Sequence, residues 1–238
     1  MTGLLGACRK TTTLPCGNNI GLKLDDWSSS IHSMSRANHT ADTREHLLAT
    51  GEAIIQGKGF AAVGLAEILS SAGVPKGSFY HYFPSKEGYG VEMLRRYFLN
   101  YHERLVLLLR PEAGHARDCL LTYFQGWVDH HPCSEHNHTC LAVKLAAEVS
   151  DLSEPMREML AEGMGRLIHR LADAIRRGQQ EGSLCTHLEP DELAASLYSL
   201  WVGSALLYKV MRSQQPMLNA YKLTETMLVQ PANASCKR

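Results

Sequence analysis

Cys140 is a candidate for thiol chemistry because it directly precedes an apolar segment with helical periodicity, Leu141–Val149. At a helix N-terminus the free backbone amides and the helix dipole stabilise a thiolate over a thiol. A thiolate attacks electrophiles and oxidants, and the product changes the size and polarity of the side chain. This position predicts a reactive thiol that converts a chemical insult into a change of helix packing.

The segment before Cys140 offers a second chemistry. Cys133, His136 and His138 stand close before Cys140, and these residue types are ligands that zinc or copper accepts. The spacing matches no established metal template, and both histidines can equally be solvated loop side chains. Metal binding by this set therefore stays open, and Cys133 is also the candidate resolving thiol for a disulfide with Cys140.

Lys209 is the second candidate sensor residue, because it is the only charge in the segment Trp201–Met211. A charge in an apolar segment is costly unless it is paired or lies at an edge. If Lys209 points inward, its ammonium would lower the pKa of the Cys140 thiol. The alternative is that its apolar stem lies along the surface and its ammonium reaches water.

The elements that must position these residues are predicted to be helices throughout. From Thr43 the chain turns helical, and Gly57 to Gly59 end this first helix. Apolar residues with a 3.6-residue period then mark further helices, and no segment alternates as strands do. The fold class is therefore all-α. The expected helices cover residues 65–71, 86–109, 115–131, 141–150, 155–181, 190–213 and, more weakly, 216–229.

Between the first two long helices, the stretch Gly73–Glu87 reads as a helix-turn-helix. Gly73 permits a sharp turn, and Pro75 suits the first position of the next helix. Phe83, Pro84 and Ser85 break that short helix, with Ser85 as the cap of the long one. A helix held in this way can lie in the major groove of DNA.

The predicted DNA-contacting residues lie mainly on this short second helix. Gly77 and Ser78 are small enough to let the backbone approach base edges, while Lys76 can meet guanine or phosphate. Lys86 stands at a helix N-terminus, where its ammonium and the free amides would form an anion site. The full candidate set is Thr43, Lys76, Gly77, Ser78, Tyr80, His81, Tyr82 and Lys86.

On these residues the segment from about Thr43 to Leu94 resembles the TetR-type transcriptional repressors. Their hallmark is a glycine turn, an aromatic-rich helix and then F-x-S-K-E, which stands here as Gly73–Glu87. The resemblance implies an N-terminal three-helix helix-turn-helix domain and a C-terminal helical domain for ligand sensing and dimerisation. It also implies a homodimer that binds a palindromic operator in double-stranded DNA.

Two segments are similar, more narrowly, to the TetR-type branch that responds to electrophiles such as N-ethylmaleimide. They are Thr43–Tyr101 and Thr139–Met156. By this resemblance Cys140 occupies the sensing position, and Lys209 matches a lysine that can partner the thiol. A small electrophile is then the inducer, and a non-covalent hydrophobic ligand or a metal ion is the alternative.

The resemblance also predicts the dimer interface, from apolar stripes on the helices near 155–181 and 190–213. These stripes can equally belong to the core of one chain. Their members are Met156, Leu160, Leu167, Leu171 and Ala174 on the first helix, and Leu193, Leu197, Leu200, Ser204, Leu207 and Met211 on the second.

Composition sets the remaining expectations. The chain has 238 residues, 45% of them hydrophobic, and a formal net charge of zero, so charge alone gives no hint of nucleic acid. We expect no transmembrane span and no secretory signal, and the seven irregularly spaced cysteines favour a reducing cytoplasm. No catalytic motif is present, so we expect neither an enzyme nor a cofactor.

The expected domain boundaries follow from these segments. Residues 1–40 are predicted to be a disordered extension. Two alternatives stay open: the protein starts at Met34, or this segment is a mobile arm that contacts DNA. Residues 41–88 form the DNA-binding domain, 89–230 the regulatory and dimerisation domain, and 231–238 a flexible tail.

Overall fold

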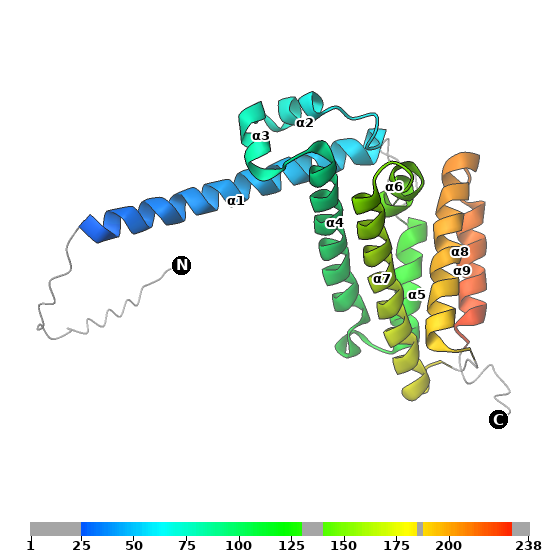
Figure 1. The fold of residues 1–238 in the computed structure, drawn as a ribbon. Helices are drawn as coiled ribbons and strands as arrows, with labels where there is room; N and C mark the ends of the chain where they lie inside the picture. The colour runs from blue at the N-terminus through cyan, green and yellow to red at the C-terminus, as the bar shows by residue number, and fades with distance from the viewer. Residues whose placement is uncertain (1–24, 130–139, 185–187, 230–238) are drawn as a thin grey trace, which may run out of the picture. The chain divides into compact units, whose positions relative to one another are not determined.

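The computed structural model describes residues 25–129, 140–184 and 188–229, with the backbone alone for residues 25–41. Within these ranges all the regular structure is helical, which confirms the predicted fold class (Figure 1). The helices are α1 (Asp25–Lys58), α2 (Leu65–Ala72), α3 (Lys76–Tyr82), α4 (Lys86–Leu109), the 3₁₀ turn η1 (Pro111–Ala113), α5 (Ala116–Asp129), α6 (Leu141–Val149), α7 (Glu154–Gln180), α8 (Pro190–Met211) and α9 (Gln215–Met227).

The chain divides into two compact units, residues 1–42 and 43–238. In the first unit α1 begins at Asp25, well before the start that the sequence predicts at Thr43. Residues 25–40 were expected to be disordered, and the structure corrects this to helix. Periodicity detects a helix through its apolar stripe, and residues 25–42 carry no such stripe. The rest of the expected extension and tail lies outside the described residues.

In the second unit the turn between α2 and α3 follows the predicted pattern. Gly73 adopts φ 64°, a left-handed conformation that suits glycine, and caps α2 with its amide. Pro75 precedes α3 as its N-cap in extended geometry, one position earlier than expected. Ser85 caps α4, since its hydroxyl accepts a hydrogen bond from the Gly88 amide at 2.9 Å. Local capping therefore sets where α3 ends and α4 begins.

Aromatic side chains hold α3 against α1 and α4. Phe79, Phe83 and Tyr89 are fully buried, with ring centroids 5.0–5.5 Å apart. The Tyr89 hydroxyl donates a hydrogen bond to the Leu47 carbonyl of α1 at 2.8 Å. This contact needs Gly51, because a Cβ there would lie 1.7 Å from the Tyr89 hydroxyl oxygen.

We predict that Gly51→Ala destabilises the protein, because the added methyl group would displace Tyr89 from the core. Overpacking of this kind costs about 1–3 kcal/mol. Urea denaturation followed by circular dichroism measures the change in the free energy of unfolding. The control is Gly57→Ala, where an added Cβ meets nothing within 4 Å in the same helix and should be neutral or stabilising. Equal stability of the two variants would contradict this packing.

The C-terminal part of this unit is a bundle in which α7 packs against α4, α5, α6 and α8, while α9 covers α5 and α8 (Figure 1). The whole predicted stripe of α7, from Met156 to Ala174, is buried within one chain. The structure therefore corrects the assignment of this stripe to a dimer interface, and α7 has its apolar face in the core. A period of 3.6 residues cannot distinguish a core from an interface.

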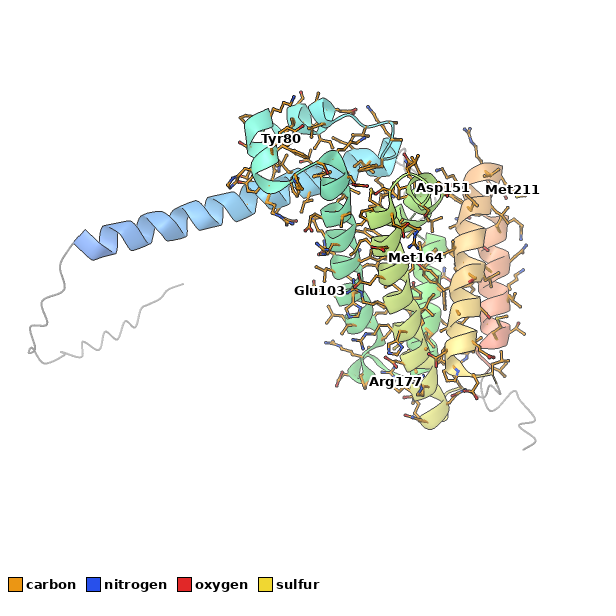
Figure 2. The ribbon with its side chains drawn as sticks, viewed as in Figure 1. Tyr80, Glu103, Asp151, Met164, Arg177 and Met211 are labelled. Atoms are coloured by element: carbon orange, nitrogen blue, oxygen red, sulfur yellow. The ribbon has the colours of Figure 1, made fainter. Side chains whose placement is uncertain are left out.

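The predicted stripe of α8 divides along its length. Leu193 and Leu197 are buried, whereas Leu207 is 46% and Met211 is 62% exposed. Figure 2 shows Met211 at the end of α8. The further exposed apolar side chains of α8 and α9 are Leu206, Val210, Leu218 and Leu223.

Of the described helices, α8 is long and apolar enough to cross a membrane by length and composition. This is weak evidence for a span, because the core helix of a soluble protein passes the same test. Trp201 of α8 is fully buried, and its indole donates a hydrogen bond to Thr224 of α9 at 2.9 Å. The apolar character of α8 thus has a role inside the bundle.

Candidate functional site

The outer face of α3 carries most of the predicted DNA contacts. Lys76, Gly77 and His81 are exposed, and Tyr80, labelled in Figure 2, is 52% exposed. Ser78 and Tyr82 are half-buried. The buried Phe79 holds the opposite face of the helix in the core. Six of the eight predicted residues therefore lie together on one short helix.

The other two predicted DNA contacts, Lys86 and Thr43, lie outside α3, on α4 and α1. The Lys86 ammonium donates to the Phe60 carbonyl at 2.8 Å and lies 4.6 Å from the centroid of the Phe60 ring. Burial lowers the pKa of Lys86. The expected anion site at this ammonium is thus a contact between α4 and the loop after α1. Thr43 is half-buried within α1 rather than at its start.

Cys140 occupies the position that the sequence predicts, directly before α6. It is the N-cap residue of that helix, and its carbonyl accepts a hydrogen bond from the Lys144 amide at 3.0 Å. Its side chain is half-buried, and Sγ lies 3.1 Å from the Tyr97 hydroxyl of α4. The thiol therefore lies at a helix N-terminus and contacts a second helix.

Tyrosines surround this thiol, and sequence analysis did not select them. The Tyr101 and Tyr123 hydroxyls lie 2.9 Å apart. Burial is the main cause that raises the pKa of both Tyr97 and Tyr101 well above the usual value, and it raises the pKa of Tyr123 to about 12. The phenols are therefore neutral at physiological pH. The signal that could have found them is the i, i+4 spacing of Tyr97 and Tyr101, which places both on one face of α4.

A cavity of about 610 Å³ opens beside Cys140. Its aromatic wall consists of Tyr97, Tyr101, Tyr123 and Trp127, and three charged residues, Glu52, Arg96 and Arg104, also line it. Arg96 pairs with both Glu45 and Glu52 across α1 and α4. A mostly apolar cavity of this size with a few polar groups fits a small organic molecule.

The helix that begins after Cys140 is fastened to the end of α1. The Lys144 ammonium donates to the Gln56 and Gly57 carbonyls, both at 2.6 Å, so a cation caps the C-terminus of α1. One turn further, the Glu148 carboxylate accepts hydrogen bonds from the Phe60 and Ala61 amides at 3.1 and 2.5 Å. We call Lys144 and Glu148 the α6 clamp.

The clamp uses the same face of α6 as the thiol, because positions 140, 144 and 148 are four residues apart. It also explains Gly59, which has φ 96° and whose Cβ, if present, would lie 2.9 Å from a Glu148 oxygen. A displacement of Cys140 relative to Tyr97 would thus act on the segment that leads into α2 and α3.

The remaining predicted residues do not join this site. Lys209 is exposed on α8, and no hydrogen bond or ion pair joins it to Cys140. The pKa of Lys144 is lowered, first by burial and second by the positive charge of Lys209. Cys133, His136 and His138 lie outside the described residues. Within the described part of the chain, no group of three or more His, Cys, Asp or Glu residues could hold a metal ion.

Two family models match the two halves of the chain. The model for bacterial regulatory proteins of the tetR family matches residues 47–88. The model for the tetracyclin repressor-like C-terminal domain matches residues 116–223. The first match covers the end of α1, α2, α3 and the start of α4, and the second covers α5 to α8 with most of α9, including Cys140.

Individual proteins match over most of their length. The chain is 44% identical to the HTH-type transcriptional repressor NemR of Escherichia coli (strain K12) over 191 residues, 80% of this chain and 96% of the relative. It is 29% identical to the HTH-type transcriptional repressor DhaR of Mycobacterium sp. (strain GP1), over 73% of this chain and 86% of the relative. The crystal structure of reduced E. coli NemR matches with a TM-score of 0.77 and 46% identity, over 80% of this chain and 99% of that one.

Proposed function

Because the chain belongs to the TetR family of bacterial regulatory proteins, we propose that it is a transcriptional repressor that releases DNA when an electrophile or oxidant modifies Cys140. One observation carries this proposal. Cys140 is the N-cap residue of the helix whose side chains clamp the end of α1, and it lines a cavity large enough for a small organic molecule. The relatives that match are transcriptional regulators.

DNA recognition would use α3 in the major groove. Its exposed and half-buried residues combine a cation, small side chains and aromatic hydroxyls, which suit phosphates and base edges. A homodimer would place two such helices on the half-sites of a palindromic operator. The exposed apolar side chains of α8 and α9, including Leu207 and Met211, support a dimer interface there. Such a regulator would act in the cytoplasm, where thiols are reduced.

Release would follow from the contacts of α6. A group added to Sγ crowds the 3.1 Å contact between Sγ and the Tyr97 hydroxyl, and this crowding would shift the first turn of α6. The α6 clamp then carries this shift to the C-terminus of α1 and the connection into α2. Modification of the thiol would thereby change the relative stability of two arrangements of the DNA-binding helices and favour the second one.

A second candidate function is induction by a non-covalent ligand. The cavity of about 610 Å³ supports it, because its aromatic wall can bind a small hydrophobic molecule without a bond to sulfur. Such a ligand would act through the same helices but would not depend on the thiol. Replacement of Cys140 therefore separates the two functions.

We predict that Lys76→Ala weakens operator binding and lowers the slope of log affinity against log salt by about one, as the loss of one phosphate contact does. Fluorescence anisotropy at several salt concentrations measures both quantities. Arg166→Ala is the control, because this exposed cation lies on α7 and pairs with Glu162 at 3.4 Å. An unchanged salt slope in the Lys76 variant would show that this lysine contacts no phosphate.

The experiment that tests the proposed function is an anisotropy titration of DNA from upstream of the protein's own gene. The wild-type protein is titrated before and after treatment with N-ethylmaleimide. We expect salt-dependent binding before treatment and release after it. Binding that persists after complete thiol modification would contradict a thiol switch and favour the non-covalent ligand.

A further inference from the structure

The hydroxyl that contacts the Cys140 sulfur belongs to Tyr97. It lies 3.1 Å from Sγ, and either group can be the donor. The neighbouring hydroxyls of Tyr101 and Tyr123 already pair with each other at 2.9 Å. Among these three phenols, Tyr97 is therefore the one placed to exchange a proton with the thiol.

A second hydroxyl near the thiol lacks a partner. Tyr198 is 4% exposed, and its hydroxyl makes no hydrogen bond to the described part of the chain. It interacts electrostatically with both Cys140 and Tyr123, so it lies on the same side of the bundle. A buried hydroxyl without a partner is unfavourable. A bound molecule that carries a carbonyl oxygen would supply the missing acceptor.

From these contacts, and resting on the proposed function of Cys140, we propose that Tyr97 relays a proton when the thiol adds to a conjugated carbonyl compound. Sγ forms a bond to the β-carbon, while the π electrons of the alkene shift toward the carbonyl oxygen. The thiol proton passes to the Tyr97 oxygen as the phenol's own proton passes to that carbonyl oxygen. The phenol is regenerated, and the enol product returns to the carbonyl form by proton exchange with water.

The surroundings of Tyr97 favour a relay over separate charged steps. Burial and the neighbouring Cys140 raise the pKa of Tyr97 well above its usual value, so the phenol keeps a proton to give. A free phenolate at Tyr97 would pay a desolvation cost among the buried rings. Movement of both protons together leaves no isolated charge in the cavity wall.

The test is the rate at which N-ethylmaleimide modifies Cys140, measured by mass spectrometry of the peptide that contains it. At neutral pH we expect Tyr97→Phe to react at least about a hundredfold more slowly than wild type, the lower end of the scale of a lost proton-transfer group. Its rate should rise steeply with pH, because only the thiolate then reacts, and the two proteins should converge in alkaline solution. The wild-type rate should depend less on pH.

Tyr101→Phe is the matched control, because it removes a hydroxyl one turn away that contacts Tyr123 and not sulfur. It should react at nearly the wild-type rate with the wild-type pH profile. Equal rates and pH profiles for Tyr97→Phe and wild type would overturn the relay. So would equal slowing by both variants, which indicates a structural effect.

A measurement on wild type alone covers the case in which Tyr97→Phe fails to fold. Reaction in D₂O should be slower than in H₂O if protons move during bond formation, and the absence of a solvent isotope effect would overturn the relay. Because modification of Cys140 is measured directly, a failure of the proposed function can be distinguished from a failure of the relay. A fully modified protein that still binds DNA would contradict the switch while the relay kinetics stand.

Discussion

Cys140→Ser is expected to bind operator DNA as wild type does and to keep it after treatment with N-ethylmaleimide. The hydroxyl of serine can replace the thiol as the partner of Tyr97, but it does not react with the maleimide. In wild type, treatment should weaken binding by between about fivefold and 150-fold, the usual range of coupling between two sites. Anisotropy titrations of both proteins, with and without the reagent, measure the difference.

The other cysteines supply the control for this result. Cys119 is buried on α5, and Cys119→Ser should release DNA on treatment as wild type does. Release of the Cys140 variant would move the sensor to a different residue. Failure of wild type to release would favour a non-covalent inducer.

The double variant Lys144→Met, Glu148→Met is expected to react at Cys140 normally and to lose most of the response of DNA binding. Both substitutions keep an unbranched side chain but remove the hydrogen bonds from α6 to the end of α1. The effect of thiol modification on DNA affinity should nearly vanish, because α6 can then move without displacing α1. Peptide mass spectrometry measures the reaction, and anisotropy measures the response.

The double variant Glu162→Met, Arg166→Met is the control for the loss of charge alone, because it removes an exposed ion pair of α7. This control should keep the full response. A clamp variant that still releases DNA as strongly as wild type would exclude the α6 clamp as the route between the two sites. The route would then be sought in the contacts of α4.

The DNA-reading half could be predicted closely because its signals are local. Gly73 takes the left-handed conformation that its turn requires, and Ser85 caps α4 through its own hydroxyl. The N-cap position of Cys140 follows from the same kind of local signal, an apolar helix that begins at the next residue. Such features depend on neighbours along the chain and need no knowledge of tertiary packing.

Contacts between residues that are far apart in the sequence could not be predicted from such local signals. Tyr97 and Cys140 are 43 residues apart and meet because the packing of the bundle brings α4 and the start of α6 to the same cavity. The ammonium of Lys86 contacts the Phe60 carbonyl for a similar reason, although its place at a helix N-terminus suggested an anion. The apolar stripe of α7 has a core partner that periodicity does not specify. In each case the missing information is which surface the helix packs against.

A protein that retains Cys140 as its only cysteine tests most directly whether one modified thiol changes DNA affinity. This protein is titrated with N-ethylmaleimide while the extent of modification and the anisotropy of bound operator are followed in the same samples. We predict that bound DNA decreases as the modified fraction rises and that the decrease is largest at one equivalent per chain. DNA that stays bound when every Cys140 carries the adduct would contradict the account.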